Sequence, residues 1–182
     1  MVTAIAPAVA IDARVSAAAG GDRAAAQALC RELLPRVRNL VRYLVRGDAR
    51  VDDIAQEALI AVLRGLRSYR GDGAFQAWVD RIVARSAFAT LRRLRAETQQ
   101  GAEDVAGSER DHVEESPYED RRELAAALDQ LPHDQRQALI LHFSVGMTVP
   151  ESAEAVSAPF ETVRSRLRLA KATLRDTLKG AA

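Results

Sequence analysis

Residues that bind metals or form disulfides are scarce in this sequence. Cys30 is the only cysteine, so the chain can form no intramolecular disulfide and no cysteine-based metal cluster. The three histidines, His112, His133 and His142, are scattered along the chain, and we expect neither a zinc site nor another cofactor. No clustered set of nucleophile, base and metal ligands is present, so we predict that the chain is not an enzyme.

The sequence also lacks a long apolar run. Residues 1–10 are apolar, but no basic residue precedes them as it would in a signal peptide. No apolar stretch is long enough to span a bilayer. We therefore expect a soluble, cytoplasmic protein without membrane insertion.

Aromatic residues make up only 4% of the chain, whereas hydrophobic residues in total make up 48%. Alanine, leucine and arginine dominate, and these side chains lose little rotamer freedom in a helix. No alternating strand pattern occurs, so we predict an all-α fold. The predicted order is a disordered leader over 1–19, a helical domain over 20–95, a flexible acidic linker over 96–121 and a second small helical domain over 122–180.

The net charge of +1 conceals a segregation of charge along the chain. Residues 20–95 hold 15 arginines against 8 acidic residues, a net of +7, and residues 160–182 hold 6 basic against 2 acidic residues, a net of +4. Residues 96–123 hold 10 acidic against 3 basic residues, a net of −7. Two basic blocks on either side of an acidic spacer favour two surfaces that meet one polyanion, although solvated charged faces would give the same pattern.

A first candidate binding helix follows Asp52 and Asp53, which suit the positive end of a helix and are expected to cap it. Ile54, Ala58, Ala61 and Val62 form a core stripe. A second face at helical spacing contains Asp53, Gln56, Glu57, Ile60 and Arg64. The pattern is typical of a docked helix, and equally of a central core helix with a polar edge.

A second candidate helix begins near Ala77 and contains a basic stripe. Its members are Arg81, Arg85, Phe88, Arg92 and Arg95, which span about 80° at 100° per residue. Guanidinium groups bind phosphates and stack on bases, and an aromatic ring among them offers a stacking platform. The alternative is a solubilising arginine face with Phe88 packed on the arginine stems, and Trp78 is expected in the core.

Residues 148–175 predict a helix-turn-helix. Thr148 and Glu151 fit a capping box, and Pro159 suits the first turn of a second helix. The buried stripe of that helix is Val163, Leu167, Ala170 and Leu174. Its outer face places Glu161, Thr162, Arg164, Ser165 and Arg168 near bases and Lys171 and Arg175 near phosphates. The alternative is an amphipathic helix pair with a charged outside.

Taken in order, these motifs resemble the extracytoplasmic-function (ECF) sigma factors of the sigma-70 superfamily. Residues 53–57, DIAQE, are similar to the D-x-x-Q-E stretch of sigma region 2, and residues 75–82, FQAWVDRI, to its F-x-x-W-L-x-R-I stretch. Residues 131–139 resemble the opening of region 4, and residues 162–167, TVRSRL, its recognition helix. Four residues depart from the family pattern: Arg85 (often asparagine), Ser152 (isoleucine), Ser157 (glycine) and Glu161 (glycine).

The resemblance implies an alternative sigma factor that recruits core RNA polymerase to promoters and helps to melt them. The polymerase clamp would meet Asp53, Gln56, Glu57, Ile60 and Arg64. The melted minus-ten strand would meet Arg70, Phe75, Arg81, Arg85, Phe88 and Arg92. The duplex minus-thirty-five element would meet Glu161, Thr162, Arg164, Ser165, Arg168 and Lys171. Because members of this family are commonly inhibited by an anti-sigma factor, the resemblance also implies such an inhibitory partner.

Two other functions remain open from the sequence. One is a sigma mimic that sequesters an anti-sigma factor and never touches DNA, which should lack the basic face around Arg164 and Arg168. The other is a helix-turn-helix regulator that binds duplex DNA without polymerase and dimerises through its N-terminal domain.

Overall fold

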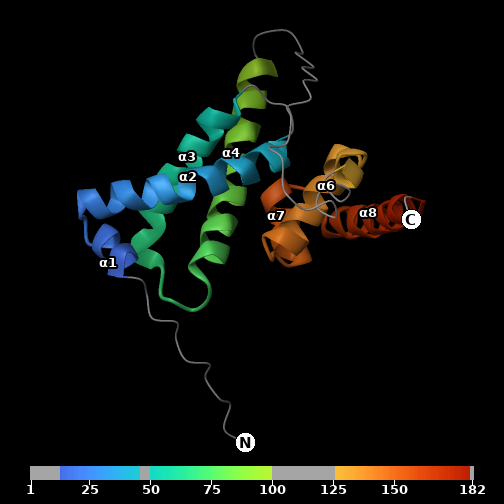
Figure 1. The fold of residues 1–182 in the computed structure, drawn as a ribbon. Coiled ribbons are helices and arrows are strands. Elements are labelled where there is room, and N and C mark those ends of the chain that lie inside the picture. The colour runs from blue at the N-terminus through green and yellow to red at the C-terminus, as the bar shows by residue number, and fades with distance from the viewer. Residues whose placement is uncertain (1–12, 46–49, 100–125, 181–182) are drawn as a thin grey trace, which may run out of the picture.

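The computed structural model describes residues 13–45, 50–99 and 126–180, and every regular element in these residues is helical (Figure 1). The elements are α1 (Ala13–Ala19), α2 (Arg23–Val45), α3 (Val51–Gly65), η1 (Leu66–Ser68), α4 (Phe75–Gln99), α6 (His133–Leu139), η2 (Ile140–Ser144), α7 (Val149–Val156) and α8 (Phe160–Gly180). The all-α prediction is confirmed. Residues 1–12 of the predicted leader and 100–121 of the predicted linker lie outside the described residues.

The N-terminal module, residues 13–99, is built on α2, α3 and α4, which pack against one another. Each contributes a stripe of fully buried side chains, such as Val37 on α2, Ile54 and Val62 on α3 and Val83 on α4. Of the predicted core stripe of α3, Ile54, Ala58 and Val62 are buried, whereas Ala61 is half-buried. The predicted aspartate cap of this helix is wrong, because the N-cap residue is Arg50 and no side chain caps the helix.

Two boundaries of the N-terminal module differ from the prediction. Residues 13–19, predicted as part of a disordered leader, form α1, whose Val15 and Ala18 are buried against α2. The two residues are three positions apart and so share one helix face. At the other end, α4 continues to Gln99, so the first residues of the predicted linker are helical.

The C-terminal module, residues 126–180, packs α6, α7 and α8 around Leu131, Leu139, Val163 and Leu167. A capping box begins α7 as predicted: the Glu151 amide donates to Thr148 Oγ1 at 3.3 Å, and the Thr148 amide donates to Glu151 Oε2 at 2.8 Å. Pro159 does not lie in the first turn of α8, which begins one residue later, but its carbonyl accepts from the first amides of that helix.

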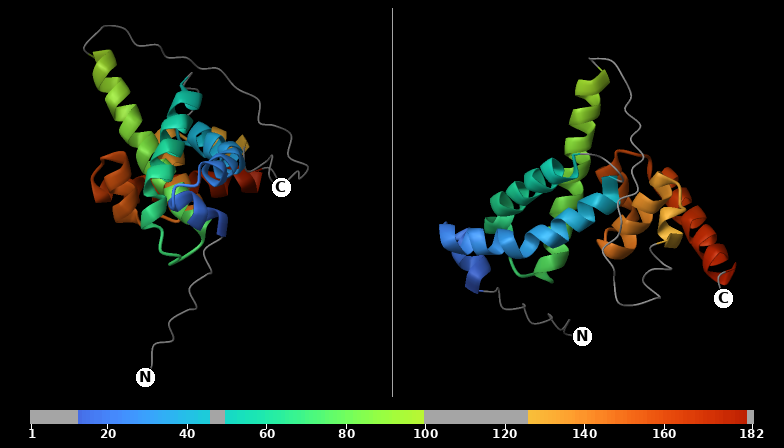
Figure 2. Two further views of the ribbon diagram at one scale, coloured as in Figure 1. Left: turned by 90° about the vertical axis from the view of Figure 1, so that its left-hand side faces the viewer. Right: turned by 45° about the horizontal axis from the view of Figure 1, so that its top comes forward.

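The two modules also pack against each other. α6 lies beside the C-terminal end of α2, and α7 lies beside α4. α8 extends away from α4 (Figures 1 and 2). The core of the N-terminal module continues into the C-terminal one through Ile140, Leu141, Val145, Met147 and Ala155. The predicted picture of domains joined through a linker did not include this shared core. None of the described helices combines the length and the apolar character that crossing a membrane requires.

Candidate functional site

The outer face of α3 forms a candidate protein-binding surface together with α4. Asp53, Gln56, Ile60 and Arg64 are exposed and Glu57 is half-buried. An open groove of about 360 Å³ between the helices is lined by Arg50, Asp53, Gln56, Glu57, Ile60, Thr90 and Leu94. An adjoining groove is lined by Glu57, Ile60, Ala61, Arg64, Ser86 and Arg93. The two grooves bring together all five residues that the sequence predicted for this surface.

Glu57 is fixed in these grooves by two residues of α4. Thr90 Oγ1 donates to Glu57 Oε2 at 2.6 Å, and Arg93 Nη2 donates to Glu57 Oε1 at 2.5 Å. The hydrogen bonds from Thr90 and Arg93 lower the pKa of Glu57, because they favour its charged form. Sequence reasoning missed both partners, since helical spacing relates residues within one helix and says nothing about a partner on another.

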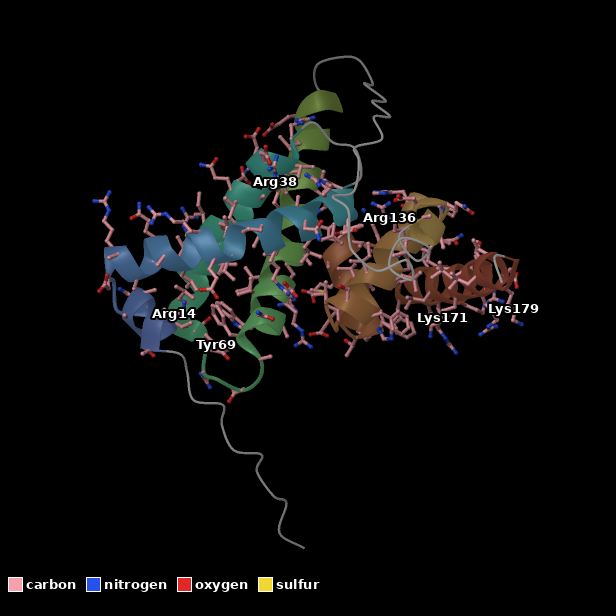
Figure 3. All side chains as sticks on the ribbon, viewed as in Figure 1. Arg14, Arg38, Tyr69, Arg136, Lys171 and Lys179 are labelled. Atoms are coloured by element: carbon pink, nitrogen blue, oxygen red, sulfur yellow. The ribbon has the colours of Figure 1, made fainter. Side chains whose placement is uncertain are left out.

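The turn before α4 is held by an aromatic cluster. The ring of Phe75 stacks on that of Trp78 with centroids 5.7 Å apart, and Tyr69 meets the edge of Phe75 at 5.2 Å. Tyr69 Oη donates to the carbonyl of Gly73 at 2.6 Å and so fixes the loop (Figure 3). Phe75, predicted to contact the minus-ten element, is partly buried in this cluster, whereas Arg70 is exposed beside it.

The basic stripe of α4 is only partly as predicted. The structure contradicts the prediction that Phe88 offers its ring as a stacking platform, because the residue is 6% exposed and belongs to the core. Its side chain is buried, where an aromatic ring gains favourable free energy by leaving water. Arg81, Arg85 and Arg92 are exposed as expected, and their guanidinium groups approach the C-terminal module.

The outer face of α8 is exposed along its length and carries Glu161, Arg164, Ser165, Arg168, Lys171 and Arg175, with Thr162 half-buried beside them. Arg164 Nη1 lies 3.6 Å from Glu161 Oε1, one helical turn earlier. Lys171 Nζ lies 4.7 Å from the ring centroid of Phe143, a cation–π contact. Lys171 and Lys179 lie along the edge of α8 that faces away from α4 (Figure 3). This face can meet a polyanion without moving any other helix.

The two modules offer surfaces that suit binding. Within residues 13–45, 50–99 and 126–180, no group of three or more His, Cys, Asp or Glu side chains is placed to hold a metal ion. What the two modules offer is a mixed polar and apolar groove on one and a basic helix on the other. The basic helix follows a capped helix and a left-handed turn residue, Ser157, in the order of a helix-turn-helix.

Comparison with known proteins identifies the family. Residues 29–97 match the family model of sigma-70 region 2, and residues 121–174 match that of sigma-70 region 4. The chain belongs to the sigma-70 family. The RNA polymerase sigma-H factor of Pseudomonas aeruginosa is 32% identical over 171 residues, which cover 87% of this sigma factor and 89% of the relative. The ECF RNA polymerase sigma factor SigM of Mycobacterium tuberculosis is 32% identical over 165 residues, which cover 90% and 82%.

These relatives place this sigma factor in the ECF group, as the sequence motifs indicated. The ECF RNA polymerase sigma-E factor of Escherichia coli is also 32% identical, over 162 residues that cover 81% of this chain and 83% of the relative. A similar fold occurs in the sigma factor RpoE of Bartonella quintana, whose structure was solved in complex with the anti-sigma factor NepR. The two share a TM-score of 0.59 and 23% identity, over 84% of this chain and 96% of RpoE. Sigma factors are transcription initiation factors.

Proposed function

We propose that this ECF sigma factor recruits core RNA polymerase to promoters through three surfaces and has no catalytic activity of its own. The α3–α4 grooves bind the polymerase, α8 binds the duplex minus-thirty-five element, and the basic stripe of α4 with its preceding loop binds the melted minus-ten strand. The observation that carries the proposal is the order of regions 2 and 4 together with an exposed basic face on α8. The protein works in the cytoplasm, where its polymerase is.

The chemistry of the α3–α4 grooves fits a protein partner. Ile60 is 39% exposed among polar neighbours and offers an apolar anchor, while Glu57 is already oriented by Thr90 and Arg93. An apolar anchor ringed by oriented charges is the usual composition of a protein–protein contact. The proposed partner here is the polymerase clamp.

The chemistry of the two basic faces fits DNA in two states. An exposed helix of a helix-turn-helix enters a major groove and reads base edges near its N-terminus, which assigns Glu161, Thr162, Arg164, Ser165 and Arg168 to bases. Lys171 lies further along the helix, where phosphates are contacted. On α4, Arg81, Arg85 and Arg92 would bind the phosphates of a separated strand and stack on its bases, which favours the melted state. An anti-sigma factor is a further proposed partner, since the RpoE fold was solved with one.

Reconstituted transcription tests the proposal. Core polymerase with the purified chain on genomic DNA should give defined start sites, and core polymerase alone should not. Start sites should weaken in Arg168→Ala, with discrimination between minus-thirty-five sequences relaxed, but not in Arg31→Ala, a matched change on the exposed face of α2. If no start sites appear while the chain alone protects duplex DNA, the protein is a polymerase-independent regulator.

A second test concerns the strand-binding stripe. Arg85→Ala should reduce promoter opening, measured by permanganate reactivity of unpaired thymines, more than it reduces binding to core polymerase. Equal loss of both would assign Arg85 a structural role and remove it from the proposed minus-ten surface.

A further inference from the structure

An exposed aromatic ring lies beside the outer face of α8. Phe143 of η2 is 59% exposed, more than any other large hydrophobic side chain in the described part of the chain. Its neighbours Leu141 and Val145 are at most 2% exposed, so the segment that carries the ring is itself well packed. Single exposed apolar residues are common on protein surfaces, and the surroundings of the ring therefore decide what it does.

The backbone of η2 and a histidine fix the position of the ring. η2 is a π-helix, in which an amide donates to the carbonyl five residues earlier, as the Val145 amide does to Ile140 at 3.0 Å. His142 Nδ1 donates to the carbonyl of Met147 at 2.8 Å, and its ring meets that of Phe143 in a T-shaped contact with centroids 4.7 Å apart. Because Met147 is 1% exposed, His142 joins the exposed ring to the core.

A lysine of α8 lies over the face of the Phe143 ring. Lys171 Nζ is 4.7 Å from the ring centroid, which is within the range of a cation–π contact. Lys171 and Lys179 are the only lysines among the 26 basic residues of the sequence. A lysine has a compact charge on a flexible four-carbon stem, so its ammonium stays in one place only when a neighbour holds it. Phe143 is such a neighbour.

Lys171 lies where a helix in a major groove contacts the DNA backbone. It follows Arg164 and Arg168 at helical spacing on the exposed face of α8, about two turns after the first and one turn after the second. The N-terminal turns of such a helix face base edges, and later turns face phosphates. An ammonium has three N–H donors, so it can face an aromatic ring and a phosphate at the same time.

We propose that Phe143 is a positioning residue for duplex DNA: its ring holds the Lys171 ammonium in place for a phosphate of the minus-thirty-five element. The inference rests on the proposed function of α8. A lysine side chain loses rotamer entropy when it binds. Because Phe143 already restricts Lys171 in the free protein, less of this loss occurs on binding. The duplex-binding surface therefore extends from α8 onto η2.

Four variants separate positioning from direct contact with DNA. Lys171→Ala removes the charge, and Phe143→Leu keeps an apolar side chain but removes the aromatic face. The double variant combines the two changes, and Phe143→Trp offers the ring type that binds cations best. Lys179→Ala is the matched control for the lysine change, because Lys179 is exposed in the last turn of α8 and belongs to no proposed binding surface.

The first measurement is NMR of the full chain labelled with ¹³C-lysine, which should give side-chain signals from two residues only. Protons over the face of an aromatic ring are shifted upfield by its ring current. The ε protons of Lys171 should therefore resonate upfield of those of Lys179. The difference should vanish in Phe143→Leu and persist in Phe143→Trp. Equal shifts for the two lysines in the parent would overturn the inference.

The second measurement is binding of the holoenzyme, assembled from core polymerase and the full chain, to a labelled promoter fragment from a mapped start site. It is made in the cold, where the duplex stays closed. Phe143→Leu should raise the Kd roughly two- to fivefold. The slope of log K against log salt should not change, because the charge of Lys171 remains. Lys171→Ala should raise the Kd at least as much and make the slope shallower by about 1, whereas Lys179→Ala should leave both near the parent values.

The double variant decides between positioning and direct contact. In the Lys171→Ala background, Phe143→Leu should cause no further loss, because the ring then has no ammonium to hold. Equal losses in both backgrounds would overturn the inference and assign the ring to DNA or to folding. An unchanged or lower Kd in Phe143→Leu would also overturn it. If Phe143→Leu loses helical circular dichroism, Phe143→Met replaces it, with the same changes expected.

Failure of the inference can be told from failure of the proposed function. If Lys171→Ala changes neither the Kd nor the slope, Lys171 contacts no phosphate and the role of Phe143 is refuted, while the mapped start sites still identify a sigma factor. Absence of start sites would refute the proposed function and with it the DNA role of Phe143. The ring contact with Lys171 is tested separately by NMR of the free chain.

Discussion

At the scale of the residue, α4 is anchored to α2 by one buried carboxylate. Asp80 is 5% exposed, and Arg36 donates to it from Nε at 2.9 Å and from Nη2 at 2.6 Å. The hydrogen bond to Asp80 raises the pKa of Arg36. Arg36→Ala leaves the carboxylate buried without this partner, and we expect a loss of roughly 2–3 kcal/mol, toward the low end for buried pairs because Arg36 is itself half exposed. Urea unfolding followed by circular dichroism measures it, with Arg31→Ala, on the same helix, expected within about 0.5 kcal/mol of the parent.

A second residue-scale prediction concerns acid. The pKa of Glu57 is lowered chiefly by hydrogen bonds from Thr90 and Arg93, so this stabilisation is present above the ordinary glutamate pKa and is lost as pH falls through the lowered value. Thr90→Val removes the donor with the largest effect on Glu57 at nearly constant volume and should raise the pKa of Glu57. A ¹³C NMR titration of the Glu57 carboxyl measures the shift. Thr173→Val on α8 should leave it unmoved, and an unshifted titration in Thr90→Val would show that the hydrogen bond does not form in solution.

The sequence predicted correctly which residues are exposed where the helical position of a side chain alone determines its exposure. It failed where the size and polarity of the side chain determine whether it is buried. The exposed face of α3 and the basic residues of α8 lie where helical spacing put them. Phe88 shares the angular sector of Arg81 and Arg85 but is buried, because burial of an aromatic ring is favourable whereas a guanidinium is costly to bury without partners. The sequence left open a solubilising arginine face with Phe88 packed on the arginine stems, and spacing alone could not place the ring in the core.

At the scale of the element, the turn between α7 and α8 has an unfavourable residue. Ser157 closes α7 at φ 53°, in the left-handed region where glycine has no steric penalty. Ser157→Gly should therefore stabilise the chain by about 0.5–1 kcal/mol, part of the left-handed penalty being offset by the added flexibility of the unfolded chain. Ser157→Ala should give no gain. Thermal unfolding of both variants measures the change in stability. Equal changes for Ser157→Gly and Ser157→Ala would mean that the left-handed backbone of Ser157 does not destabilise the chain.

Helices with a long periodic pattern of apolar residues could be predicted from the sequence, and short helices could not. The capping box of Thr148 and Glu151 marked the start of α7, and the buried stripe of Val163 and Leu167 marked α8. By contrast, α1 has seven residues and buries two. A helix this short is unstable by itself and forms because α2 covers it, so its sequence carries almost no periodic signal.

At the scale of the whole molecule, the contact between the two modules could not be predicted from the sequence, because most of its acceptors are backbone atoms. Apart from the ion pair of Arg85 with Glu151, its polar contacts end on the backbone carbonyls of Tyr43, Leu44, Gly146 and Ala155. Every residue has such a carbonyl, so no pattern of side chains marks the acceptors. Arg81 and Arg92 could be assigned to DNA from their spacing, but spacing gives no sign of a competing partner within the chain.

A shared core predicts shared unfolding. Because Leu141 and Met147 are buried in the same cluster as the core of the N-terminal module, loss of either module exposes apolar surface of the other. The parent and Gln130→Glu, a change on an exposed side chain, should therefore melt in one calorimetric transition, with calorimetric and van't Hoff enthalpies equal. Gln137→Glu, which replaces the donor to the Leu44 carbonyl with a buried carboxylate, should resolve into two transitions, the less stable module melting first. Two separate transitions in the parent would mean that the modules fold independently and that the shared cluster contributes little to stability.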